Sequence, residues 1–162
     1  MIGSGKTADR PQDTATAFDL GKAIAESEWV LLSGGRDSGI MDAVNKGAKE
    51  AKPDVLTIGI IPGKDKKGLS DCVDVGIVTG MGSARNNINI LSSDVVIACG
   101  YGGSGTASEI ALALKAGKHV ILLNERPDCR KFFATIGGKL LQSVESTISL
   151  VKTLLEKQKS KV

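Results

Sequence analysis

The sequence predicts an α/β protein with a doubly wound, mainly parallel sheet in three layers. Short apolar runs alternate with amphipathic stretches along the chain, and the runs are continuous, as in strands that helices cover on both faces. A length of 162 residues, with 41% hydrophobic and 24% charged residues, is that of one globular domain. We therefore expect a single Rossmann-like ligand-binding domain over residues 1–162.

Continuous apolar runs define the expected strands, which lie at 30–32, 55–61, 75–78, 95–98 and 120–123. A strand is also needed before the first helix, and only Met1 and Ile2 stand ahead of the first glycine, so we expect this strand to be short. Apolar residues recur at helical spacing in the stretches 14–27, 40–51, 85–91, 106–116 and 143–157. Asp13 is a predicted N-cap, and Gly117 is predicted to end the fourth helix.

Composition excludes several classes of protein. The net charge of +3 is too small for nucleic-acid binding, and 3% aromatic residues leave no stacking platform for single strands. The apolar runs are too short to span a membrane and no signal peptide is recognisable, so we expect a cytoplasmic protein. Cys72, Cys99 and Cys129 lack metal-ligand spacing, and the single His119 argues against a histidine triad or a zinc site.

Three glycine-rich loops, at 33–39, 79–87 and 100–105, each follow a predicted strand and precede a predicted helix. In a parallel sheet such loops meet at the carboxyl edge, where ligands bind. Glycines ahead of a helix leave backbone N–H groups free to bind an anion, and Arg36 and Arg85 add charged donors. We expect a phosphate-bearing or oxyanion ligand. The alternative is a plain turn for each loop and a surface salt bridge for each arginine.

Two nucleotide motifs are interpreted as chance matches. The loop 100–105 fits G-x-G-x-x-G, with Glu125 at a suitable distance, but that fingerprint belongs at the first strand of a sheet. Here we expect only one further strand and one further helix, which argues against a nicotinamide cofactor. The triplet 5–7 reads Gly-Lys-Thr but has no strand and no earlier glycine of a P-loop before it.

The glycine loops resemble the family once described as possible lysine decarboxylases, which includes the LOG phosphoribohydrolases. Residues 101–109 read YGGSGTASE, similar to the family hallmark P-G-G-x-G-T-x-x-E, and residues 34–41 match its G-G-G-x-x-G-[LI]-M stretch. Met81 to Asn86 correspond loosely to the family segment M-x-x-R-K. The chain departs from these patterns at three positions, Arg36, Asn86 and Tyr101. The segments 78–87 and 92–100 are most similar to the molybdenum cofactor carrier branch.

This resemblance implies a homotetramer that binds molybdenum cofactor, an anionic pterin with a terminal phosphate, as cargo and without turnover. The phosphate would bind the N–H groups of 102–106, while Ser33, Asn86 and Asn87 would bind polar pterin or oxo groups. Client proteins would be molybdoenzymes or insertases, and no protein metal ligand is expected. The apolar face of the last helix, from Ser143 to Leu155, is expected to support the oligomer. The predicted binding residues are Ser33, Gly34, Gly35, Arg36, Arg85, Asn86, Gly102, Gly103, Ser104, Gly105 and Thr106.

Two alternatives use the same pocket. In a LOG-type phosphoribohydrolase, Glu109 would stabilise cationic charge on the ribose of a nucleoside 5′-monophosphate, and Arg85 would hold the phosphate or the leaving base. Asn86 in place of the family lysine and Tyr101 in place of its proline favour the carrier. A small-molecule sensor with neither role is the third interpretation.

Overall fold

The computed structural model describes residues 1–3, 11–100, 103–123 and 127–160, with the backbone alone for 127–130. Strands and helices alternate over most of this length, as the sequence predicts. In chain order the elements are β1 (Ile2–Gly3), α1 (Pro11–Glu26), β2 (Leu31–Ser33), α2 (Gly39–Ala51), β3 (Thr57–Ile61), β4 (Val75–Val78), the 3-10 helix η1 (Gly82–Arg85), α3 (Asn86–Leu91), β5 (Val95–Cys99), α4 (Ser104–Lys115), β6 (His119–Leu123), α5 (Pro127–Thr135), β7 (Lys139–Leu141) and α6 (Val144–Lys159).

All strand pairs are parallel, in two sets ordered β2-β3-β4 and β1-β5-β6-β7. The amino group of Met1 donates a hydrogen bond to the carbonyl of Leu32 at 2.7 Å, which brings β1 beside β2 and joins the two sets. The chain therefore runs outward from β1 to β4, then returns to place β5 on the other side of β1. The carboxyl ends of β1, β2 and β5 therefore lie at this reversal, which is where doubly wound sheets bind ligands.

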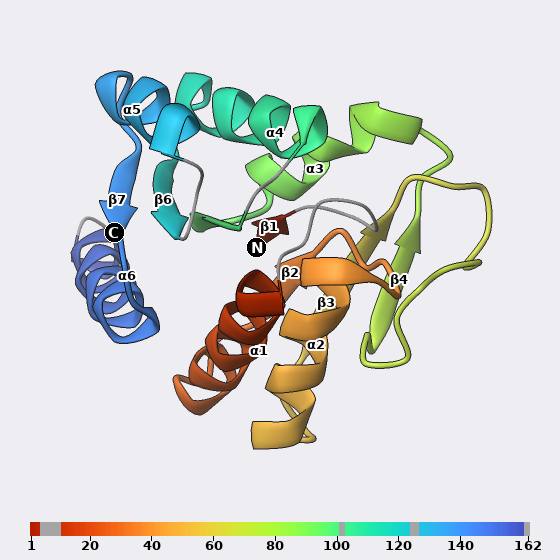
Figure 1. Ribbon diagram of the computed structural model, residues 1–162. Helices are drawn as coiled ribbons and strands as arrows, with labels where there is room; N and C mark the ends of the chain where they lie inside the picture. Colours follow the sequence, from red (N-terminus) through yellow and green to blue (C-terminus); the bar gives the residue numbers. More distant parts are fainter. Residues whose placement is uncertain (4–10, 101–102, 124–126, 161–162) are drawn as a thin grey trace.

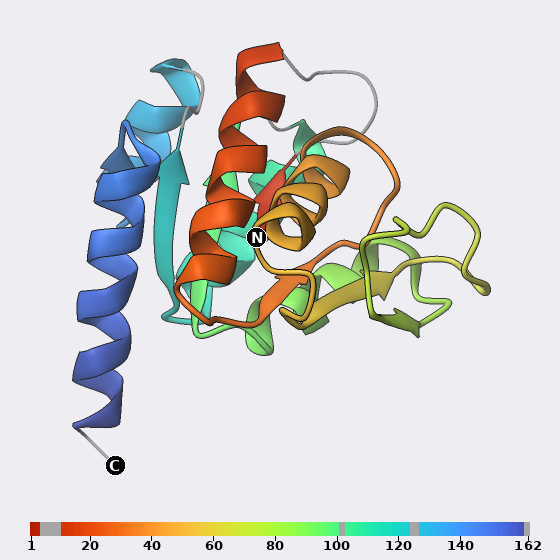
Figure 2. The ribbon, with the colours of Figure 1, turned by 90° about the horizontal axis from the view of Figure 1, so that it is seen from below.

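Helices cover both faces of the sheet. Helices α1, α2 and α6 lie on one side and α3, α4 and α5 on the other (Figure 1), and Figure 2 shows α6, α1 and α2 from their own side. Each side has its own buried apolar cluster: Ile97 and Cys99 of β5 belong to the first, Val96 and Ala98 to the second. This alternation within one strand confirms the predicted three-layer arrangement.

Close backbone contact locks α1 against α2. A Cβ atom built on Gly21 would meet the carbonyl oxygen of Val44 and lie 2.9 Å from the amide nitrogen of Ala48. On the facing helix, a Cβ on Gly47 would meet the carbonyl oxygen of Phe18. The two helices therefore approach as closely as glycine permits, and larger residues at these contacts would force them apart.

Strand β4 departs from the prediction that every strand is buried on both faces. Val75 and Ile77 are each 44% exposed. They pair with Ile58 and Ile60 of β3, so all four side chains lie on the α3–α5 side of the sheet. The helices of that side do not extend over β4, the edge strand (Figure 1). An apolar strip of Ile58, Val75 and Ile77, which we call the uncovered sheet face, is left beside solvent.

Two elements were not predicted, α5 and β7. Two strand–helix units therefore follow the glycine loop 100–105 rather than one, which removes one reason for rejecting the nicotinamide motif; its Glu125 lies outside the described residues. The predicted N-cap Asp13 is wrong as a cap, because it lies buried inside the first turn of α1. The predicted end of α4 at Gly117, which has φ of 71°, is confirmed. Helix α6 is capped by Ser143, whose hydroxyl accepts from Ser146 N at 3.2 Å.

Helix α6 packs its apolar face on its own chain. Val151 and Leu154 are buried, and Val144, Ile148 and Leu155 pack against the same cluster as α1 and α2. The expectation that this face supports an oligomer therefore loses its structural basis. No helix among the described ranges is both long and apolar enough to cross a membrane.

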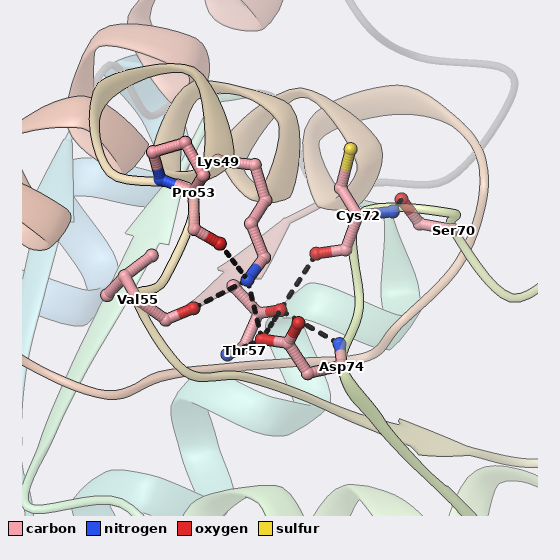
Figure 3. A network of polar contacts seen from close by, with 7 residues as sticks. All are labelled: Lys49, Pro53, Val55, Thr57, Ser70, Cys72 and Asp74. Atoms are coloured by element: carbon pink, nitrogen blue, oxygen red, sulfur yellow. Dashed lines mark hydrogen bonds and ion pairs between the residues drawn. The ribbon is translucent and has the colours of Figure 1, made fainter.

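A polar network fixes the amino ends of β3 and β4 (Figure 3). Lys49 donates to the carbonyl of Val55 at 2.7 Å and to a carboxylate oxygen of Asp74 at 2.7 Å. The same oxygen accepts from the amide of Thr57 at 2.8 Å, and the Thr57 hydroxyl donates to the carbonyl of Cys72 at 2.8 Å. The Lys49 ammonium holds the pKa of Asp74 below its usual range, and the Thr57 hydrogen bonds add to this effect.

We expect Asp74→Asn to lower the free energy of unfolding by about 1 kcal/mol at pH 7, a small effect because the carboxylate is 41% exposed. A lowered pKa in the folded state stabilises the fold above the unfolded pKa, and this contribution is lost as pH falls through the folded one. Urea unfolding at pH 7 and below about pH 4 should therefore give a difference between variant and parent that shrinks with acid. Asp54→Asn, at an exposed carboxylate nearby, is the control and should change neither value.

Candidate functional site

The glycine loops after β2 and β4 converge on one side chain, Arg85. Gly34, in the loop after β2, lies directly against it: a Cβ atom built there would be 2.7 Å from Nη1 and 3.0 Å from Nη2 of Arg85. Arg85 ends η1, the short helix that follows the glycines after β4. Gly34 therefore leaves the space that the guanidinium occupies, and the predicted meeting of these loops is present.

Helix α4 brings Glu109 to the same place. Asn89, one turn after Arg85 on α3, donates from Nδ2 to Oε1 of Glu109 at 3.3 Å. Arg85, Asn89 and Glu109 are 6%, 2% and 7% exposed, respectively, so all three are buried. Asn89 was missed from the sequence, because its partner lies 20 residues away on another helix and no local pattern marks it.

Burial dominates the electrostatics of this cluster. Desolvation raises the pKa of Glu109 above its ordinary value, while the Asn89 hydrogen bond and the charge of Arg85 oppose the rise. Desolvation likewise lowers the pKa of Arg85; Glu109 opposes this effect and the nearby charge of Arg36 adds to it. Both charged forms are thus held in the fold at a cost, a state that is common at binding and catalytic sites.

Glu109→Gln should therefore stabilise the protein at neutral pH. A carboxyl group with a raised folded pKa destabilises the fold when it is ionised, and the penalty disappears as pH falls below the unfolded value. We expect the melting temperature at pH 7 to rise by about 2–4 °C, and the gain to shrink near pH 4. A lower melting temperature for Glu109→Gln at pH 7 would show that the pairing with Arg85 outweighs desolvation.

Hydrogen bonds to a buried side chain hold the loop after β2 in place. The hydroxyl oxygen of Ser33 accepts from the amide of Gly35 at 3.1 Å and from Nδ2 of Asn45 at 3.1 Å. Ser33 is fully buried, so its side chain supports the loop. Gly35 has φ of 70°, and a Cβ there would lie 2.9 Å from Cα of Gly59. Arg36 is exposed at the loop tip, beside the cluster whose charge it influences.

The first turn of α4 lies where the sequence predicts an anion site. Gly103 precedes the helix, and the amide of Ala107 donates to its carbonyl. The amides of Ser104, Gly105 and Thr106 come earlier in the chain, at the positions where the amides of a helix have no partner within the helix. Cβ atoms on Gly103 or Gly105 would meet no atom of the described residues within 4 Å. Thr106 is buried, whereas the other three are exposed. The backbone of this turn is therefore open to a ligand; Gly102 and Tyr101 lie outside the described residues.

The remaining candidate residues lie beside this site or far from it. Asn86 is buried at the start of α3, and Asn87 is exposed next to it. His119 opens β6 at the opposite edge of the sheet from the glycine loops, as predicted. Neither Cys72 nor Cys99 forms a disulfide within the part of the chain that the structure describes. A groove of about 760 Å³ lies between α1 and α6, away from the glycine loops.

Comparison with known proteins places the chain in a family. Residues 1–155 match the model of the SLOG cluster4 family. An uncharacterized protein of Archaeoglobus fulgidus is 44% identical over 123 residues, which cover 76% of this chain and 77% of the relative.

Two solved structures are similar over nearly the full length. The molybdenum cofactor binding protein of the phototrophic bacterium Rippkaea orientalis is 50% identical, covers 94% of this chain and 93% of its own, and superposes with a TM-score of 0.89. The molybdenum cofactor carrier protein of Chlamydomonas reinhardtii is 46% identical, covers 96% and 95%, and gives a TM-score of 0.86. The chain therefore belongs to the SLOG cluster4 family, and it shares the fold of the molybdenum cofactor carrier proteins at about half sequence identity.

Proposed function

We propose that this protein binds molybdenum cofactor and carries it without chemical turnover. The observation that carries the proposal is identity of 46–50% over 94–96% of the chain to proteins described as binding or carrying that cofactor. The open first turn of α4 supports it, because the cofactor bears a terminal phosphate and a helix N-terminus binds phosphate.

Each part of the ligand has a counterpart at the carboxyl edge of the sheet. The N–H groups of 102–106 bind the phosphate, and Arg36 and Arg85 balance its charge. Asn86 and Asn87 supply amide groups for polar atoms of the pterin or its oxo ligands. Gly34, Gly35 and Ser33 shape the wall against which Arg85 lies, so the loop after β2 acts through the arginine that it positions.

Purification without oxygen tests this proposal directly. We expect the protein to retain a pterin and molybdenum in equal amounts, detected by absorbance and by mass and metal analysis. The loaded protein should also activate a cofactor-free molybdoenzyme, the class of client that we propose together with insertases. Protein that neither retains the cofactor nor binds it when it is supplied without oxygen would contradict the carrier function.

A second candidate function is cleavage of a nucleoside 5′-monophosphate to base and ribose phosphate. It is favoured by the meeting of Arg85 with Glu109, which brings an anion-binding cation and a carboxylate to one site. Incubation with AMP, with chromatographic detection of adenine, distinguishes the two functions. We expect no release above the rate without protein. Release that disappears in Glu109→Ala would establish the hydrolase instead.

We also propose that the protein is a homotetramer in the cytoplasm. The thiol of Cys72, which forms no disulfide in the described part of the chain, would stay reduced in that compartment. The uncovered sheet face supports self-association, because a soluble chain gains free energy by covering exposed apolar strand residues. A second copy is the occupant that we assign to this face.

Ile77→Lys should split the assembly, because it places a charge in the middle of the uncovered sheet face. Light scattering at micromolar concentration should return a lower mass for this variant than for the parent protein. Leu140→Lys, at an exposed apolar residue of the other edge strand β7, is the matched control and should keep the parent mass. If only Leu140→Lys dissociates the assembly, the interface lies at β7 and the placement on β4 is wrong.

A further inference from the structure

Among the residues that the structure describes, two buried polar atoms of the Arg85–Asn89–Glu109 cluster have no hydrogen-bond partner: Nε of Arg85 and Oδ1 of Asn89. Buried polar groups are nearly always paired, so each exception needs an explanation. The two atoms are of opposite kind, because the arginine nitrogen carries a donor and the amide oxygen is an acceptor. Both belong to side chains that are more than nine-tenths buried beside the candidate ligand site.

The cluster offers donor groups on Arg85 and acceptor atoms on Asn89 and Glu109. Arg85 contributes the donor N–H at Nε, and Asn89 contributes its amide oxygen. Glu109 is an acceptor through its carboxylate, and its contact with Asn89 at 3.3 Å is at the long end for a hydrogen bond, so it can be exchanged for a shorter one. A ligand that pairs with Nε of Arg85, Oδ1 of Asn89 and the carboxylate of Glu109 must therefore present one acceptor and two donors.

We propose that Arg85, Asn89 and Glu109 together recognise the amide edge of a bound heterocycle with a 2-amino-4-oxo pyrimidine ring. That edge, which pterins and guanines share, presents an amino N–H, a ring N–H and a carbonyl oxygen. Arg85 donates to the carbonyl, while Glu109 and Asn89 accept from the two N–H groups. This inference rests on the proposed function for the identity of the ring, since the cofactor that we assign is a pterin.

The position of the cluster suits a ligand that also carries a phosphate. Glu109 follows Gly103 by six residues, so the cluster lies about 9 Å along α4 from the anion-binding turn. This distance is comparable to the length of a fused ring that carries a phosphate on a short side chain. One ligand can therefore place its phosphate on the first turn of α4 and its ring against the cluster.

Entry of the ring requires Arg85 to move, and the preceding turn has room for that movement. Residues 81–84 are exposed, and a Cβ atom on Gly82 would meet no atom within 4 Å. Room for movement of η1 therefore lies on its solvent side, while the amide of Gly82 donates to the carbonyl of Pro62 at 3.0 Å. Before the ligand enters, Nε of Arg85 is buried and unpaired. The carbonyl of the bound ligand then becomes its hydrogen-bond partner.

The test compares 6-hydroxymethylpterin with 6-hydroxymethyllumazine, which has a carbonyl in place of the 2-amino group. Binding is measured by calorimetry on the parent protein. We expect the lumazine to bind at least about tenfold more weakly, because its added oxygen faces acceptors. Glu109→Gln, which supplies an amide donor toward position 2, should reduce or reverse this preference. Asn89→Leu should weaken binding of both probes, because both carry the ring N–H. Equal affinity of the parent for both probes would overturn the inference.

Further arms separate this inference from the proposed function and identify the source of the ring. Preference for pterin over lumazine in a protein that fails to retain molybdenum cofactor would leave the edge recognition standing and remove the carrier function. Retention of the cofactor by a protein that binds pterin and lumazine equally would leave the carrier function standing and remove the edge recognition. Guanosine, which has the same edge, tests whether a purine ring is accepted: binding comparable to that of the pterin supports recognition of the edge itself. Thermal melts of each variant show that the fold is kept.

Discussion

Gly103→Asp is expected to abolish binding of phosphate-bearing ligands while the fold stays intact. The new side chain has space, because a Cβ atom at Gly103 meets nothing within 4 Å and the backbone φ of −81° suits any residue. Aspartate is also a favoured residue before a helix, so α4 should keep its stability. Its carboxylate would occupy the amides of Ser104 to Thr106 and repel a phosphate. Loss of two charge-assisted hydrogen bonds corresponds to about 3 kcal/mol or more, over 100-fold in affinity.

Gly103→Asn is the matched control, since it has nearly the same shape without the charge. It should weaken binding far less, and circular dichroism should be unchanged in both variants. Calorimetry with a pterin monophosphate measures the difference. Unchanged affinity in Gly103→Asp would show that the turn before α4 is only a connection and binds no anion.

Gly34→Ala is expected to damage the site more than the fold. The added methyl group would collide with Sδ of Met41 and lie 2.7 Å from Nη1 of Arg85. Both atoms are at the ends of flexible side chains, so the chain can yield at small cost in stability. The guanidinium, however, must leave its place beside Glu109. We expect ligand affinity to fall at least about tenfold, which is the loss of one charge-assisted hydrogen bond, with little change in melting temperature.

Gly63→Ala serves as the control for Gly34→Ala. Its methyl group would be 3.7 Å from the nearest atom, the carbonyl oxygen of Asp65, which is an ordinary contact. This variant should match the parent in affinity and in melting temperature. Normal affinity in Gly34→Ala would mean that the position of Arg85 is unimportant for the ligand.

The sequence was sufficient for most of the fold because its strands are marked by continuous apolar runs. Strands β5 and β6 were placed within one residue of their observed bounds for that reason. Strand β7 has only three residues and begins with an exposed lysine, so it has no such run. The exposure of β4 could not be predicted from the sequence either, because it depends on how far the helices of one layer extend over the sheet.

The sequence predicts those residues of the candidate site whose position follows from the sheet topology. It does not predict those whose position depends on how side chains and helices pack. The rule that glycine loops of a parallel sheet share one edge brought Gly34, Arg85 and Gly103 into one prediction. The burial of Ser33 follows from its place on the same side of β2 as the buried Leu31, which could be read only once the register was known. Asn89 depends on the fit of α3 against α4, and no spacing in the chain encodes that fit.

The interlocked pair α1 and α2 has a consequence for the thermodynamics of binding. Helix α2 continues directly from the loop that holds Gly34, and its backbone cannot slide past α1, so this wall of the site is preorganised and loses little entropy when a ligand arrives. The wall made by η1 and Arg85 lacks such an anchor. The ordering cost of binding therefore falls almost entirely on one side of the ligand, and changes that stiffen η1 would increase affinity without adding a single contact.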